Sequence, residues 1–199
     1  MKLSKGNKFL LLGIILVVID QAIKILVKTN MTLGQSIVVF PNWFQILFIE
    51  NEGMAFGMKF GGAVGKFLLS FFRIGLFAAL CWWIHSLIRK DNVPTGVIVG
   101  LTLITAGAFG NIIDSLFYGL IFNYAPFMFG RVVDMLYFPI IDTFWPSWMP
   151  FVGGEHFLFF SPVFNFADSC VTVGAIYLIL FQYRFFAGSD ESKESKNKA

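Results

Sequence analysis

The sequence contains little charge and few cysteines or histidines. Only 14% of its 199 residues are charged, and it has two cysteines and two histidines. Against this, 57% of the residues are hydrophobic and the mean hydropathy is +0.74. A soluble domain of ordinary composition carries more charge and less apolar sequence. The composition therefore excludes an ordinary soluble domain and indicates a membrane protein.

Four apolar stretches are long enough to cross a bilayer, which takes roughly 20 helical residues for about 30 Å of hydrocarbon. They are residues 9–27, 64–87, 96–122 and 163–186. We predict an all-α integral membrane protein with four transmembrane helices in one domain, residues 1–188. The polar tail, residues 189–199, has too little apolar surface to fold. No small-residue cleavage site follows the first stretch, so we expect this helix to be retained.

Lysine and arginine gather before the first stretch, between the second and third, and after the fourth. The positive-inside rule then places both termini in the cytoplasm and the two longer loops outside. The net charge of +3 follows from these anchoring residues and requires no nucleic-acid partner.

Several common catalytic motifs are absent. The sequence has no HExxH zinc motif, no GxSxG nucleophile elbow and no internal repeat. His85 and His156 fall on opposite sides of the predicted membrane. Cys81 and Cys170 fall inside predicted helices, where a disulfide between them is not expected. Metal and serine catalysis therefore have little support.

The first outer loop predicts a small sheet on the outer membrane surface. "SIVVF" and "FQILFI" are β-branched and aromatic runs separated by "PNW", which is typical of two strands around a turn. The second outer loop is rich in aromatics, and prolines 139, 146, 150 and 162 divide it into pieces too short to span. We expect it to lie along the membrane or to dip into its outer edge.

Charges inside the predicted spans are functional candidates, because each costs at least ~2.5–3.5 kcal/mol at the bilayer centre. Asp20 and Lys24 are four residues apart and can pair on one helix face, which favours a structural ion pair over a direct role in chemistry. A polar stripe on the third helix fits a packing interface or the lining of a site equally well. Its members are Gly107, Asn111, Asp114 and Tyr118.

Asp134 and Asp168 are both predicted at the outer membrane boundary within apolar sequence. Taken alone, Asp168 could cap its helix and Asp134 could pair with Arg131. Taken together, two carboxylates in a poorly solvated place share a proton. One can then act as base on a water while the other acts as acid on a carbonyl oxygen.

Five motifs in order resemble the lipoprotein signal peptidases, also called signal peptidase II. They are "DQAIK", "NEGMAFG", "GAFGNIID", "GRVVD" and "FNFAD". The resemblance covers all four predicted helices and the first outer loop. It implies a bacterial inner-membrane aspartic endopeptidase that cleaves prolipoproteins before a diacylglyceryl-modified cysteine, without metal or cofactor. It also implies a fold of four helices with an outer β-cradle and a periplasmic helix, acting as a monomer on membrane-anchored substrates.

The same resemblance assigns roles by motif. Asp134 and Asp168 match the catalytic pair, and Asn111 and Asn165 match polar residues around it. Asp114, Asp20 and Lys24 match structural residues. A loop close to the substrate is matched by Asn51, Gly53, Ala55 and Phe56.

Two features depart from the family pattern. Ser115 stands where the family often has arginine, and Arg131 is one candidate to compensate for that loss. The connection from Asp134 to Asp168 is longer than usual, and its aromatic segment is a candidate lid over the site.

A proton-coupled transporter or a membrane scaffold is the alternative function, in which the intramembrane Asp and Lys carry protons or join subunits. A transporter should place its acids near the bilayer midplane between repeats. Here the acids gather at the outer edge of a chain without repeats, which favours the peptidase.

Overall fold

The computed structural model describes residues 4–41, 43–52, 62–139, 141–159 and 162–187. The predicted substrate-loop residues Gly53, Ala55 and Phe56, and the predicted tail at 189–199, lie outside these described residues.

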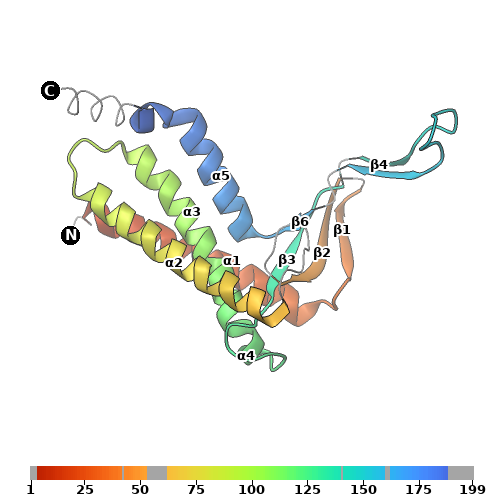
Figure 1. The fold of residues 1–199 in the computed structure, drawn as a ribbon, viewed down its shortest axis with the longest axis horizontal. Helices are drawn as coiled ribbons and strands as arrows, with labels where there is room; N and C mark the ends of the chain where they lie inside the picture. The colour runs from red at the N-terminus through yellow and green to blue at the C-terminus, as the bar shows by residue number, and fades with distance from the viewer. Residues whose placement is uncertain (1–3, 42, 53–61, 140, 160–161, 188–199) are drawn as a thin grey trace.

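Four apolar helices form the bundle (Figure 1). They are α1, Lys5–Asn30; α2, Gly62–Ile88; α3, Thr95–Ile113; and α5, Phe166–Phe181. Helix α3 continues through a π-helical turn, Asp114–Tyr118, into α4, Gly119–Ile121. By length and composition, α1, α2 and the continuous helix 95–121 could each cross a membrane, whereas α5, with 16 residues, is shorter.

The sequence predicts four membrane-spanning helices. The described residues contain three apolar helices long enough to span and one shorter apolar helix, so four spans are not established. The predicted stretch 163–186 starts as a strand, β6, Val163–Phe164, and Asn165 caps the helix that follows. At the other end, α5 stops at Phe181, and Gln182 takes a non-helical conformation. The helix is shorter than the hydrophobic run because the first two residues of the run pair with a sheet and because the helix is interrupted at Gln182.

A four-stranded antiparallel sheet lies at one end of the bundle (Figure 1). It contains β1, Ser36–Phe40; β2, Phe44–Asn51; β3, Val132–Tyr137; and β6, in the order β1-β2-β3-β6. Strands β1 and β2 confirm the two strands predicted around "PNW". Strand β3 pairs with β2 so that Asp134 lies opposite Ile49. The sheet thus places one of the predicted catalytic acids.

The aromatic segment forms a separate hairpin of β4, Ile141–Phe144, and β5, His156–Phe159. Figure 1 shows this hairpin projecting away from the helices. Near its tip Trp148 is 78% exposed and Phe151 is fully exposed. The role of this hairpin as a lid over the site stays a prediction.

The two predicted outer loops, as far as they are described, contain strands and turns but no helix. The expected periplasmic helix is therefore not found in these described residues.

The bundle and the sheet share a hydrophobic core. Val27 of α1, Phe48 of β2 and Tyr118 after α3 pack with Val133 and Met135 of β3. Because both structural layers bury side chains in one cluster, the ends of the helices are fixed relative to the strands. This fixed junction carries the candidate site.

Helices α3 and α5 approach closely at Gly107. A Cβ added there would overlap the backbone oxygen of Ala167 and meet Val171 at 2.8 Å. Glycine is therefore required for the approach of these helices, and this approach brings Asn111 of α3 beside Asp168 of α5.

We predict that Gly107→Ala lowers the free energy of unfolding by about 1–3 kcal/mol, because the added methyl group overpacks the α3–α5 contact. Thermal unfolding in detergent micelles measures the change. Gly75→Ala on α2 is the matched control, since nothing lies within 4 Å of a Cβ at that position. Equal unfolding temperatures for the two variants would contradict the prediction.

Candidate active site

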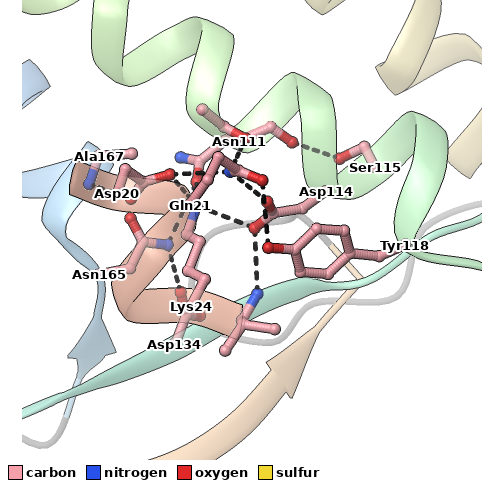
Figure 2. A network of polar contacts seen from close by, with 12 residues as sticks. Asp20, Gln21, Lys24, Asn111, Asp114, Ser115, Tyr118, Asp134, Asn165 and Ala167 are labelled. Carbon is pink, nitrogen blue, oxygen red and sulfur yellow. Dashed lines mark hydrogen bonds and ion pairs between the residues drawn. The ribbon is translucent and has the colours of Figure 1, made fainter. Parts of the chain in front are cut away.

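The predicted intramembrane polar residues converge where the bundle meets the sheet (Figure 2). They come from α1, from α3 and the π-helical turn that follows it, from β3, and from the N-cap and first turn of α5. The structure brings together Asp20, Lys24, Asn111, Asp114, Asp134, Asn165 and Asp168. Most of them are almost completely buried. Every buried side-chain nitrogen and oxygen of the described residues has a hydrogen-bond partner. Such full satisfaction makes a buried polar cluster rigid.

Lys24 lies at the centre of this cluster with no exposed surface. Its Nζ is 2.9 Å from Asp20 Oδ2, 2.8 Å from Asp114 Oδ2 and 2.9 Å from Asn111 Oδ1. Asp20 and Lys24 form the predicted ion pair, and Asp114 joins it from the π-helical turn. The stripe on α3 both packs and lines the site, because Gly107 contacts α5 while Asn111 and Asp114 bind Lys24.

Each of the two carboxylates that bind Lys24 also fixes a neighbouring backbone. Asp20 Oδ1 accepts a hydrogen bond of 2.9 Å from the backbone N–H of Ala167. Asp114 Oδ2 accepts one of 3.3 Å from the N–H of Val133. Ala167 directly precedes Asp168, and Val133 directly precedes Asp134. One ammonium group therefore holds the backbone next to both predicted catalytic aspartates.

Gln21 is a site residue that the sequence reasoning missed. Its Nε2 donates to Asp114 Oδ1 at 2.9 Å and to Asp20 Oδ2 at 3.1 Å, and its Oε1 accepts from the Tyr118 hydroxyl at 3.1 Å. The available signal was its place inside "DQAIK", between the two charged residues of that motif. A neutral amide next to an ion pair draws less attention than the charges themselves.

Two asparagines connect Asp134 with Asp168. Asn165 Nδ2 donates to Asp134 Oδ1 at 2.7 Å and to Asn111 Oδ1 at 3.2 Å. Asn111 Nδ2 in turn donates to Asp168 Oδ1 at 2.7 Å. Because Lys24 and Asn165 both donate to Asn111 Oδ1, the amide of Asn111 must turn its NH₂ group toward Asp168.

The first turn of α5 fixes Asp168. Asn165 occupies the N-cap position, where its side chain accepts from the Asp168 N–H at 2.9 Å. The Asp168 carboxylate accepts the Asn165 N–H at 3.3 Å, which completes a capping box. The alternative role of Asp168 as the helix cap is thus corrected: Asn165 is the cap, and Asp168 is its reciprocal partner.

Asp134 lies on β3 and is 3% exposed. Burial raises the pKa of its carboxyl group, and the nearby charge of Asp168 raises it further, to about 7. Hydrogen bonds from Asn165 and from the side chain of Asn51 partly oppose this shift. Asn51, predicted near the substrate, thus contacts Asp134 from the end of β2. Asp134 can hold a proton near neutral pH.

The arginine expected to compensate for Ser115 lies elsewhere. Arg131 is 45% exposed at its side chain and pairs with Glu50 at 3.3 Å, and Lys28 binds the same carboxylate. Ser115 is instead contacted by Arg73 of α2, whose Nη1 donates to Ser115 Oγ at 3.1 Å. Arg73 had no assigned role in the sequence reasoning.

An apolar helix bundle in which carboxamides join two carboxylates, one of them protonated near neutral pH, has the groups that an aspartic peptidase uses. A family model described as signal peptidase (SPase) II matches residues 12–184 of the chain. The chain belongs to the signal peptidase II family and is a membrane protease.

Known relatives extend this assignment over most of the sequence. The chain is 48% identical over 194 residues to a lipoprotein signal peptidase of Porphyromonas gingivalis, covering 90% of this chain and 84% of that protein. It is 38% identical over 188 residues to one of Amoebophilus asiaticus, covering 89% and 78%.

Solved structures support the fold. A bacterial membrane enzyme determined by the in meso method at 2.3 Å resolution superposes with a TM-score of 0.61 at 25% identity, covering 92% of this chain and 91% of that one. A second, at 1.9 Å resolution, gives a TM-score of 0.59 at 28% identity, covering 87% and 91%.

We predict that Lys24→Met lowers the free energy of unfolding by about 3–5 kcal/mol, because it leaves the buried carboxylates of Asp20 and Asp114 without their cation. Thermal unfolding in micelles tests this. Lys90→Met, at an exposed position after α2, is the control and should unfold at the temperature of the unmodified protein. Unchanged stability of Lys24→Met would show that the ion cluster is not the structural centre of the site.

Proposed function

We propose that this protease removes signal peptides from prolipoproteins, cleaving before a cysteine that carries a diacylglyceryl group. The main support is the chain of contacts Asp134, Asn165, Asn111 and Asp168, in a chain similar to curated lipoprotein signal peptidases over most of its length. The cluster lies where the helices end and the sheet begins, whereas a transporter's acids are expected near the bilayer midplane.

Asp168 serves as the base and Asp134 as the acid. Asp168 removes a proton from a water, whose oxygen attacks the carbonyl carbon before the cysteine, while Asp134 donates its proton to the carbonyl oxygen. Collapse of the tetrahedral intermediate breaks the carbon–nitrogen bond, and the proton on Asp168 passes to the leaving amine. One hydroxyl group of the intermediate returns its proton to Asp134 and becomes the carbonyl oxygen of the product acid. No acyl-enzyme forms. Asn111 and Asn165 keep both carboxylates oriented during these transfers.

The protein works in the bacterial inner membrane as a single domain, residues 1–188, and as a monomer. Four spans leave both termini and the tail 189–199 in the cytoplasm, and the site faces the outer surface. The lipid-modified cysteine enters laterally from the bilayer, and the sheet next to Asp134 holds the peptide. By its motif, Gly53 contributes to binding of the substrate. Clamping of the peptide limits the access of bulk water to the site.

We predict that Asp134→Asn and Asp168→Asn each reduce cleavage of a diacylglyceryl-modified prolipoprotein peptide by about 10²–10⁴-fold, because each removes one partner in proton transfer. Thermal unfolding checks that both variants fold. Asp91→Asn, at an exposed turn between α2 and α3, should cleave at the normal rate. Retained cleavage in both dyad variants would rule out the aspartic mechanism.

We also predict that kcat/KM falls as the pH rises through about 7, the pKa of Asp134. Burial holds the proton on Asp134 below that pH, and above it the acid is lost, so the rate should drop about tenfold per pH unit. The pH dependence of peptide cleavage in detergent measures this. A rate that stays constant for about two units above that value would exclude Asp134 as the acid.

A further inference from the structure

Arg73 is a cation within an apolar helix long enough to cross a membrane. Arginine at such a depth is rare and usually faces the interior of a bundle. Neither the mechanism above nor the polar network around Lys24 uses it.

Its neighbours on α2 indicate which way the side chain faces. Ser70, three residues earlier, is 3% exposed, and its Oγ donates to the backbone oxygen of Met128 at 3.2 Å. Phe77, four residues later, stacks on Phe109 of α3 with ring centroids 4.8 Å apart. Residues at these spacings share one helix face, so the half-buried Arg73 lies on the face of α2 that packs against α3.

A hydrogen-bond relay connects Arg73 to the residue that contacts Asp168. Arg73 Nη1 donates to Ser115 Oγ at 3.1 Å, and Ser115 Oγ donates to the backbone oxygen of Asn111 at 2.9 Å. The side chain of Asn111 then donates to Asp168 Oδ1. Ser115 is buried in the π-helical turn that follows α3, so the guanidinium is anchored to this turn.

The charge of Arg73 acts unequally on the two catalytic carboxylates. Its attraction is strongest for Asp168, weaker for Asp114 and weaker again for Asp134. Lys24, the other cation of the cluster, already lies against Asp20 and Asp114. The ionisable groups that face this region are Asp20 and Lys24 of α1, Lys66 of α2, Asp114 of the π-helical turn, Asp134 of β3 and Asp168 of α5.

We propose that Arg73 is a positioning residue that keeps Asp168 as the ionised member of the pair, so that the shared proton stays on Asp134. The inference deepens the proposed function and rests on its assignment of the dyad. A fixed positive charge nearer to one carboxylate favours ionisation of that carboxylate. Asp134 is more deeply buried than Asp168 and is attracted less strongly by Arg73, so it keeps the proton.

The first test compares Arg73→Gln with Arg73→Lys in peptide cleavage. Without the positive charge the pair loses its first proton less readily, so Arg73→Gln should move the acidic limb of the pH–rate profile about one unit higher. At pH values on the acidic limb, it should therefore reduce kcat/KM by up to about tenfold. Arg73→Lys keeps the positive charge, so its acidic limb should lie closer to that of the unmodified protein than the limb of Arg73→Gln does.

Lys66→Gln is the matched control. It removes a charge from the same helix, but this charge is attracted by Glu52 and Glu50 rather than by either aspartate of the pair, so the acidic limb should stay unchanged. A profile for Arg73→Gln that is lowered but not displaced would overturn the proposal, since a merely structural role gives that result. The same holds for a profile identical to that of the unmodified protein.

The second test needs no substrate and thus separates this inference from the proposed function. Infrared spectra recorded across a pH titration report the C=O stretch of protonated carboxyl groups. The band that titrates near neutral pH should disappear in Asp134→Asn. In the Arg73→Gln background, Asp134→Asn should leave part of this band, and a further Asp168→Asn change should remove the rest. A band that Asp134→Asn alone still abolishes in the Arg73→Gln background would refute the role of Arg73.

Discussion

The ammonium group of Lys24, buried between the carboxylates of Asp20 and Asp114, is the interaction on which the site depends. A lysine with no exposed surface cannot remain charged in an apolar bundle without such partners. Once paired, it orders the backbone as well, because Asp20 binds the N–H of Ala167 and Asp114 binds that of Val133. The buried charge of Lys24 thereby sets the position of the first turn of α5 and of strand β3.

The π-helical turn Asp114–Tyr118 lets one helix serve two layers. Such a turn widens the helix locally and is frequent at functional sites. Here Asp114 reaches Lys24, Ser115 meets Arg73, and Tyr118 packs with the strands while its hydroxyl binds Gln21. A regular α-helix would rotate these side chains onto other faces. The backbone irregularity is therefore a condition for joining bundle and sheet.

Periodicity and composition predicted the elements that depend on local sequence. The apolar runs indicated the helices, and the β-branched residues of "SIVVF" indicated β1. The pairing of β3 with β2 depends on contacts remote in sequence, and no local pattern specifies it. The same limit applies to the site. Charge and motif identified Asp134 and Asp168, whereas the bridge through Asn165 and Asn111 follows only from their juxtaposition in three dimensions.

The two catalytic candidates are chemically alike, and their elements make them different. Asp134 lies in an inner strand of the sheet, at the buried junction with the helices, where desolvation favours the protonated acid. Asp168 lies in the first turn of α5, where its side chain completes the capping box with Asn165. In the proposed mechanism, the acid and the base therefore lie on different secondary-structure elements before any substrate arrives. The membrane strengthens this separation, because an apolar surrounding increases the effect of each fixed dipole and charge on the proton.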